Sequence, residues 1–273
     1  MIPLRDRFPA PAVMGVINVT PDSFSDGGEF LDPGAAVAHG ARLAADGADI
    51  LDVGGESTRP GSDPVPAEVE LERVLPVIRG LRAVTDRPIS IDTVKAEVAA
   101  AAIAAGATFV NDVSALRGDP RMADVVSGAG VPVCLMHMLG EPKTMQDDPR
   151  YDDVVAEVAA FLAERVDAAE RCGIPEEAIC VDPGIGFGKT AEHNLSLLRH
   201  LDAIAAVGPP VLVGVSRKRF LGVLTDQPER ERDVATAAAN VEAVRRGAWM
   251  VRVHAVRETR DAIAVSRAIE AAP

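Results

Sequence analysis

AVMGVINVTPDSFSDGG, residues Ala12–Gly28, is the stretch that decides the fold of this chain. It begins with an apolar, β-rich run, Ala12–Val19, and continues into a long polar turn. An open doubly wound sheet usually carries a glycine-rich phosphate loop after its first strand. The long polar turn takes the place of that loop here, so it favours a closed barrel. The open sheet remains the alternative.

Seven further β-rich runs follow and alternate with Ala-rich stretches of helical character. The predicted strands are Ala12–Val19, Ala48–Val53, Pro88–Thr93, Thr108–Val113, Val131–Met138, Ile179–Asp182, Val211–Ser216 and Trp249–His254. Apolar residues recur at helical spacing in Glu68–Leu81 and Asp153–Ala169. Eight strands that are each followed by a helix close most naturally as a TIM barrel, and 273 residues suit one such domain. We predict an α/β fold, a single (β/α)8 barrel domain over residues 1–273.

Several short signals mark where the helices begin and end. Asp32-Pro33 and Asp119-Pro120 each read as an N-cap followed by a first-turn proline. Glycines stand where four helices should end, because a left-handed residue often closes a helix. They are Gly47, Gly106, Gly130 and Gly173.

The composition sets the class of protein and excludes some partners. Hydrophobic residues make up 48% of the chain but aromatic residues only 3%, so Ala, Val, Leu and Ile must fill the core. The net charge of −13 argues against nucleic acid and against docking on anionic lipid, since both require clustered Lys and Arg. We therefore expect neither a nucleic acid nor a membrane as partner.

Cysteines and apolar runs bear on the compartment. Cys134, Cys172 and Cys180 have no metal-site or CxxC spacing, and their odd number fits a reduced cytosolic protein. The first residues contain no apolar run long enough for a signal peptide, and no run approaches the ~18 residues of a membrane span. A cytoplasmic protein is predicted.

Polar residues follow the apolar run of every predicted strand. In a TIM barrel the C-terminal ends of the strands carry the active site. One such residue can be a buried group with a structural role, but all eight ends together indicate a site. The residues at these ends are Asn18, Asp52, Glu56, Asp92, Asn111, Asp112, His137, Asp182, Ser216, Lys218, Arg252 and His254.

Strand parity predicts which side chains face the lumen. Arg252 and His254 are two residues apart, so they share one face of the strand, while Val251 and Val253 point to the other face and suit the helix layer. Ser216 and Lys218 would share a face by the same rule if the seventh strand extends that far. Arg59, Lys218, Arg252 and His254 would thus give an acidic protein one local cationic region. An anionic ligand explains it, and salt bridges to aspartates such as Asp92 and Asp182 are the alternative.

Two long loops begin at lumen-facing strand ends. They are TPDSFSDGGEFLDPG (Thr20–Gly34) and GGESTRPGSDPVP (Gly54–Pro66). Unstructured loops of this length in a compact domain are typical of functional lids. Phe24 and Arg59 offer a ring and a charge that can close over a substrate. We expect these loops to cover the site.

Eight ordered segments resemble one enzyme family, dihydropteroate synthase. They are MGVINVTPDSFSDGG (Met14–Gly28), DVGGESTRPG (Asp52–Gly61), SIDT (Ser90–Thr93), VNDVSA (Val110–Ala115), LMHMLGEPKTMQ (Leu135–Gln146), VDPGIGFGK (Val181–Lys189), VGVSRKRFLG (Val213–Gly222) and RVHAV (Arg252–Val256). The resemblance covers the chain from the first strand to the eighth. It implies synthesis of 7,8-dihydropteroate from 6-hydroxymethyl-7,8-dihydropterin diphosphate and 4-aminobenzoate, with release of diphosphate, in folate biosynthesis.

The resemblance also implies residue roles. Asp182, Asn111 and Asp92 match the residues that read the pterin ring, and Lys218 matches a lysine near the reacting carbon. For the diphosphate, the matching residues are Arg252 and His254 as anchors, Thr58 as a further contact and Asn18 as ligand of a Mg²⁺ ion. Around 4-aminobenzoate, the matching residues are Arg59, Pro60, Phe24 and Phe187. Asp26 matches a residue thought to shield the cation that diphosphate leaves behind. The implied reaction is dissociative, with Asp26, Lys218, Arg252 and His254 in the catalytic roles.

One departure from the family pattern is visible, and it leaves other readings open. The family usually has aspartate where this chain has Ala255, whose side chain we expect to face away from Arg252 and His254. Arg219 lies at a position where the residue type varies within the family. The alternatives are a pterin-binding paralogue without turnover, the pterin domain of a corrinoid methyltransferase, and a Schiff-base lyase using Lys218. The resemblance further implies a homodimer and a place in the family that sulfonamides target.

Overall fold

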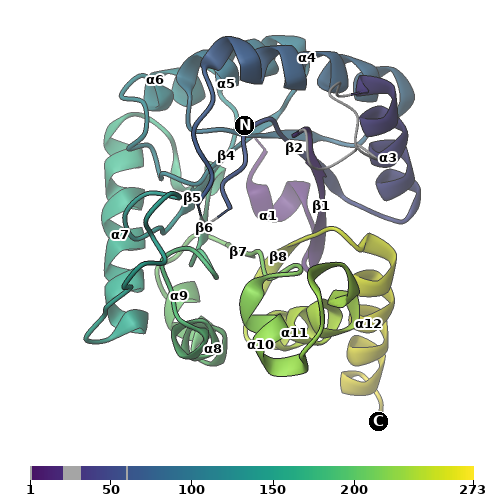
Figure 1. The fold of residues 1–273 in the computed structure, drawn as a ribbon, viewed down its shortest axis with the longest axis vertical. Coiled ribbons are helices and arrows are strands. Elements are labelled where there is room, and N and C mark those ends of the chain that lie inside the picture. The colour runs from purple at the N-terminus through teal and green to yellow at the C-terminus, as the bar shows by residue number, and fades with distance from the viewer. Residues whose placement is uncertain (1, 21–31, 60) are drawn as a thin grey trace.

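The computed structural model of this chain contains a closed barrel of eight parallel strands. It describes residues 2–20, 32–59 and 61–273. The strands pair in sequence order, and β8 closes on β1. Figure 1 shows them at the centre of the molecule with helices around them. The strands are β1 (Ala12–Asn18), β2 (Ile50–Gly54), β3 (Ile89–Asp92), β4 (Phe109–Asp112), β5 (Val133–Met136), β6 (Ile179–Asp182), β7 (Val211–Val213) and β8 (Ala248–Val253). The predicted (β/α)8 barrel is confirmed.

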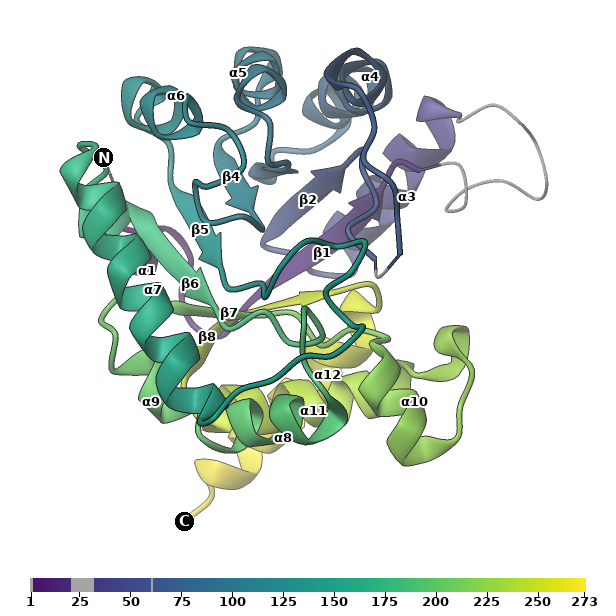
Figure 2. The same cartoon turned by 60° about the vertical axis from the view of Figure 1, so that its left-hand side comes forward.

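Helices separate consecutive strands and form the outer layer. Figure 2 shows α3, α4, α5 and α6 side by side along one part of it. The helices are α1 (Leu4–Arg7), α3 (Pro33–Ala45), α4 (Ala67–Val84), α5 (Ala96–Ala105), α6 (Met122–Ala129), α7 (Val154–Arg171), α8 (Ala191–Arg199), α9 (Leu201–Ala205), α10 (Arg219–Thr225), α11 (Asp233–Arg245) and α12 (Val256–Glu270), with 3-10 turns η1 (Glu176–Ala178) and η2 (Glu229–Glu231). Both helices predicted from periodicity, α4 and α7, are present.

The predicted cap at Asp32 is present, whereas the helix predicted after Asp119 begins later than expected. Asp32 caps α3 by accepting a hydrogen bond from the Gly34 N–H. Asp119 accepts from the Arg121 N–H, but α6 begins only at Met122, later than predicted. The four glycines predicted to end helices all have positive φ, as a left-handed closing residue requires.

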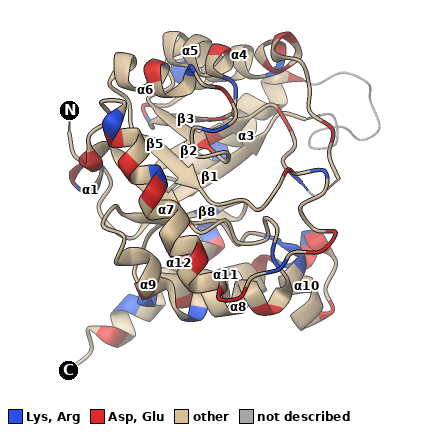
Figure 3. Ribbon diagram, turned by 90° about the vertical axis from the view of Figure 1, so that its left-hand side faces the viewer, with Lys and Arg blue, Asp and Glu red and all other residues tan. Residues whose placement is uncertain are grey.

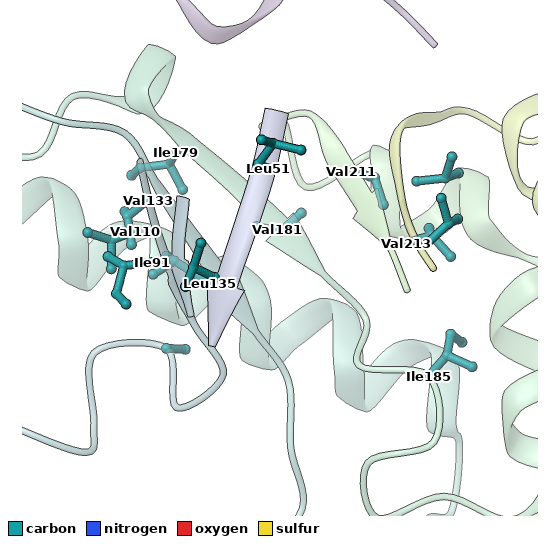
Figure 4. Packing of buried hydrophobic residues seen from close by; sticks show 14 of the residues in the cluster. Leu51, Ile91, Val110, Val133, Leu135, Ile179, Val181, Ile185, Val211 and Val213 are labelled. Atoms are coloured by element: carbon teal, nitrogen blue, oxygen red, sulfur yellow. The ribbon is translucent and has the colours of Figure 1, made fainter. Parts of the chain in front are cut away.

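Residues on each strand alternate between two apolar environments. Those that point outward, such as Leu51, Val110, Val181 and Val213, pack under the helices in the main core (Figure 4). Those that point inward near the N-terminal ends of the strands form a second cluster, which we call the barrel floor. Its members are Leu4, Phe8, Ala12, Met14, Ile50, Phe109, Cys134, Cys180, Leu212, Trp249 and Met250. The floor fills the barrel from below, and α1 and its C-cap contribute Leu4 and Phe8 to it.

The end of β7 differs from the prediction. The strand stops at Val213 and the chain enters a turn in which Arg217 has a φ of 58°. The Lys218 N–H donates to the Val215 carbonyl at 3.2 Å in this turn. Strand alternation therefore does not place Ser216 and Lys218, and the turn sets the direction of both side chains.

The outer surface carries charges of both signs. Figure 3 shows acidic and basic residues interspersed on outer helices such as α7. In the part of the chain that the structure describes, no helix combines the length and the apolarity needed to cross a membrane.

Candidate active site

A connected group of charged and amide side chains lies directly above the barrel floor. Asp52 Oδ2 accepts hydrogen bonds from Asn111 Nδ2 at 3.1 Å and from Arg252 Nε at 2.6 Å. Arg252 Nη2 donates to Asp92 Oδ2 at 2.7 Å. We call Asp52, Asp92, Asn111, Asp182 and Arg252 the polar layer. Parity explains four of the five, because Asp52, Asn111, Asp182 and Arg252 each lie two positions beyond a floor residue on the same strand.

The guanidinium of Arg252 is already paired. It forms salt bridges with Asp52 and Asp92, and its side chain is 22% exposed. Burial opposes its charged form, but the two carboxylates outweigh burial and raise the pKa of Arg252. The predicted alternative of internal salt bridges is thus correct for Asp92. The second partner, however, is Asp52 and not Asp182.

Asp92 and Asp182 are carboxyl groups in a strongly desolvated setting. Burial raises the pKa of Asp92 to about 7, against the lowering by Arg252. Burial likewise raises the pKa of Asp182, and the charge of Lys218 opposes that shift. Asp182 Oδ1 accepts from the Gly184 N–H at 2.7 Å, whereas its Oδ2 has no hydrogen-bond partner in the described residues. Asp182 therefore has acceptor capacity left for a ligand.

Lys218 reaches the same region from the turn after β7. Its Nζ donates to the Ile185 carbonyl and lies 4.2 Å from the centroid of the Phe187 ring. Burial lowers the pKa of Lys218 to about 8, against the effect of Asp182. The structure thus brings together three of the predicted residues: Lys218, Phe187 and Asp182.

His254 and Ser216 form a second pair at the strand ends. The backbone N–H of His254 donates to Ser216 Oγ at 3.1 Å, and the same Oγ lies 2.8 Å from the ring nitrogen Nδ1 of His254. Burial, followed by the charges of Arg217 and Arg252, lowers the pKa of His254 to about 3. His254 is therefore neutral near pH 7, which corrects its inclusion among the cations. If the Ser216 hydroxyl donates to Nδ1, the ring proton resides on Nε2 and is available to a ligand.

The loop after β2 lies at the rim. Arg59 is 62% exposed and pairs with Glu229 at 2.8 Å, so it does not join the polar layer. Thr58 is half-buried beside it. Glu56, predicted from its position after the strand, holds the loop instead, because it accepts from Lys95 Nζ at 2.7 Å and from the Val65 N–H at 2.8 Å.

Two other strand-end residues have structural roles. Asp112 points outward and accepts from the Ser114 N–H, the Ser114 hydroxyl and the Leu116 N–H, which fixes the turn after β4. His137 contacts Lys189 behind the site, with Nδ1 to Nζ at 2.9 Å. Burial, followed by the charge of Lys189, lowers the pKa of His137 to about 3.

Four predicted residues require separate mention. Phe24, Asp26 and Pro60 lie outside the described residues. Asn18 ends β1, is partly exposed, and its side chain has no hydrogen-bond partner in the described part of the chain. Within residues 2–20, 32–59 and 61–273, His, Cys, Asp and Glu side chains form no group of three that would hold a metal ion.

Comparison with known proteins places this geometry in a family. A family model described as pterin binding enzyme matches residues 14–254. The dihydropteroate synthase of Mycobacterium leprae is 49% identical over 260 residues, which cover 93% of this chain and 91% of that protein. The chain belongs to the dihydropteroate synthase family.

Solved structures agree with this membership. Dihydropteroate synthase of Xanthomonas albilineans with 4-aminobenzoic acid superimposes with a TM-score of 0.91 at 53% identity, covering 96% of this chain and 94% of that one. The same enzyme in complex with 7,8-dihydropteroate gives a TM-score of 0.87 at 50% identity, covering 96% of this chain and 95% of that one.

Sequence reasoning missed two contributions to this site. Asp52 lies in β2 and Ser216 in the turn after β7, and no role was predicted for either. Asp52 joins Asn111 to Arg252, and Ser216 orients His254. The strand-end position was the only signal, because their partners are far away in the sequence.

Proposed function

We propose that this protein transfers the 7,8-dihydropterin-6-ylmethyl group from its diphosphate to 4-aminobenzoate, giving 7,8-dihydropteroate and diphosphate. It would thereby act as a transferase in folate biosynthesis. The single observation that carries the proposal is the polar layer. Two hydrogen-bond acceptors lie there above an apolar floor, Asp182 Oδ2 and the amide oxygen of Asn111. A pterin offers N–H donors along one edge of its ring.

The hydrogen bonds of the polar layer determine what it can recognise. Asn111 uses Nδ2 to donate to Asp52, so its Oδ1 remains as an acceptor. Asp182 is a second acceptor, and an ionised carboxylate can accept two parallel N–H bonds. These groups support recognition of an amidine-like edge. A ligand that presents acceptors at the same positions would leave buried oxygens unsatisfied.

The diphosphate would lie toward Arg252 and His254. Arg252 Nη1 has no hydrogen-bond partner in the described residues, since Nε and Nη2 are engaged by Asp52 and Asp92. His254 would add its Nε2–H as a neutral donor. Fixed donors of this kind stabilise the charge that develops on a leaving group. Held in place before the reaction, they require little reorganisation as the bond breaks.

A Mg²⁺ ion fits the donor at the end of β1. Asn18 would supply one neutral oxygen, and Mg²⁺ is commonly held by few protein ligands together with waters and substrate phosphates. Such an ion supplies charge neutralisation to the diphosphate when it is bound.

After diphosphate departs, 4-aminobenzoate would attack the pterin methylene carbon. Lys218 and the Phe187 ring would lie beside the reacting atoms, and the rim residues Thr58 and Arg59 would cover them. Because the rim is exposed before pterin binds, we expect 4-aminobenzoate to bind weakly to the free protein and more tightly once pterin and diphosphate are present.

The test of the proposed function is product formation by the purified protein. With Mg²⁺ and both substrates, diphosphate and 7,8-dihydropteroate should appear in equal amounts, whereas either substrate alone should give no dihydropteroate. Binding of the pterin diphosphate without turnover would instead indicate the non-catalytic paralogue.

We also propose that the protein acts in the cytoplasm as a homodimer. The cysteine usage supports the compartment, and the family resemblance supports the dimer. Sedimentation of the purified protein at a mass other than twice 28.6 kDa would contradict the dimer.

A further inference from the structure

The loop Pro183–Lys189, between β6 and α8, is packed closely against its neighbours. Gly184, Gly186 and Gly188 have φ values of 66°, 82° and 62°. A Cβ on Gly184 would lie 1.8 Å from the His137 carbonyl oxygen, so only glycine fits there. The loop therefore has a defined shape, and it carries Phe187 into the proposed site.

Lys189 ends this loop as a buried amine. It is 3% exposed, and its Nζ lies 2.9 Å from His137 Nδ1 and 3.0 Å from the Phe187 carbonyl oxygen. No salt bridge joins it to a carboxylate in the described residues. Burying an amine without a counterion is costly, and burial lowers the pKa of Lys189 to about 7. In this buried position Lys189 makes two hydrogen bonds, one with His137 Nδ1 and one with the Phe187 carbonyl oxygen.

The rest of the loop is held by other side chains. Gln146 Nε2 donates to the Gly186 carbonyl at 2.6 Å, and Asn194 Oδ1 accepts from the Gly186 N–H at 2.7 Å. The Tyr151 hydroxyl donates to the Gly188 carbonyl at 2.9 Å. Within the described residues, Lys189 is the one donor to the Phe187 carbonyl. The Phe187 N–H also donates to the Gly184 carbonyl at 3.0 Å. Loss of Lys189 would therefore leave the Phe187 carbonyl without a donor, while Gly186 stays anchored.

We propose that Lys189, which is hydrogen-bonded to His137, is a positioning residue that holds the Phe187 ring next to Lys218 and so determines the affinity for the aromatic acceptor. This inference rests on the proposed function, in which Phe187 lines the 4-aminobenzoate pocket. It assigns Lys189 no contact with substrate. Because Gly186 remains held, the pterin side of the site should be unaffected.

The test compares Lys189→Met with Lys189→Gln. Met has nearly the same length without a donor, and we expect the KM for 4-aminobenzoate to rise about tenfold, the scale of one charge-assisted hydrogen bond. Calorimetric affinity for pterin diphosphate should stay within about twofold, because its contacts do not change. Gln retains a donor and should recover part of the loss in KM.

Arg260→Met is the matched control. Arg260 donates to the Gly47 carbonyl and to Asp49 at the opposite end of the barrel. This variant should lose stability without a change in either KM. If Lys189→Met does not fold, His137→Phe serves as the second variant. It removes the hydrogen-bond partner of Lys189 Nζ and keeps an aromatic ring to pack on Phe161. It should raise the KM for 4-aminobenzoate to a smaller extent.

Three outcomes would overturn the inference. These are an unchanged KM for 4-aminobenzoate in a folded variant, an equal loss of pterin diphosphate affinity, and an equal rise in KM for Arg260→Met. A wild-type protein that makes no product would overturn the proposed function and this inference together. An active wild type with unaltered kinetics in the variants would overturn the inference alone.

Discussion

The barrel floor and the polar layer share the strands β2, β4, β6 and β8 and yet have opposite properties. Phe109 belongs to the floor and Asn111, two residues later on β4, to the polar layer. Met250 and Arg252 stand in the same relation on β8. The floor contains apolar and thiol side chains in contact. The layer contains ion pairs between Arg252 and two aspartates, and it leaves Asp182 Oδ2 and Asn111 Oδ1 as acceptors for a ligand. Stability and ligand recognition are therefore divided along the barrel axis.

Arg252→Ala should have the largest effect, because Arg252 serves both properties. Removing it leaves Asp52 and Asp92 without their cation, which costs about 3–5 kcal/mol of unfolding free energy. Turnover should fall about 10²–10³-fold, as for the loss of a fixed donor to a developing charge. Thermal melts and steady-state kinetics measure the two effects. Arg257→Ala, which breaks an exposed pair with Asp46, should change neither.

Phe109→Ala tests the floor alone. Phe109 is fully buried, and truncating such a ring costs about 3–5 kcal/mol of stability. Denaturant unfolding should show this loss, while calorimetric affinity for pterin diphosphate in the folded variant should remain within about threefold. A loss of affinity as large as that of a polar-layer variant would show that the two regions do not act separately.

Asp182→Asn tests the layer alone. The amide loses the charge-assisted acceptor, so pterin diphosphate affinity should fall about 10- to 100-fold. Stability should not fall, because burial already opposes the ionised carboxylate. The matched control is Asp112→Asn, at an outward-facing strand end. It should weaken the turn after β4 and leave pterin binding intact. The reverse pattern would refute the assignment.

The pH dependence of stability should also distinguish the His254–Ser216 pair from the barrel floor. His254 has a pKa of about 3 in the folded protein, while the unfolded chain titrates near about 6.5. Between these values the unfolded state binds the proton, so stability falls as pH falls, by at most about 1.4 kcal/mol per unit. His254→Gln should reduce this slope in thermal melts recorded from about pH 7 to about pH 5. The floor has no histidine or carboxylate, so Phe109→Leu should leave the slope unchanged.

Ala255→Asp should have the smallest effect. Ala255 is the N-cap of α12 and makes no side-chain cap hydrogen bond. Aspartate there would accept from the first free N–H groups and stabilise the protein by about 1 kcal/mol. Unchanged kinetics together with a higher melting temperature would fit a capping role. A change in turnover would instead indicate that this position influences His254.

The sequence predicted the barrel and the inward direction of Arg252, because alternation on a strand is a local property. It overextended β7, since the apolar pattern continues through Val215 although strand pairing ends at Val213. The turn at Arg217 has no clear signal in a strand pattern.

Other features depend on closure of the barrel. Asp52, Asn111 and Arg252 meet only because β8 pairs with β1, so their hydrogen bonds cannot be read from spacing. The neutral state of His254 depends on burial and on neighbouring arginines, which are also tertiary properties. Residue types were therefore predictable, while partners and protonation states were not.

A crystal structure of the protein with dihydropterin diphosphate would test the central claim most directly. We expect the ring edge within hydrogen-bonding distance of Asp182 and Asn111, directly above the floor. We also expect the diphosphate at Arg252 Nη1 and His254 Nε2, with Arg252 still paired to Asp52. A pterin ring bound away from the polar layer, or a diphosphate that contacts neither Arg252 nor His254, would contradict the account.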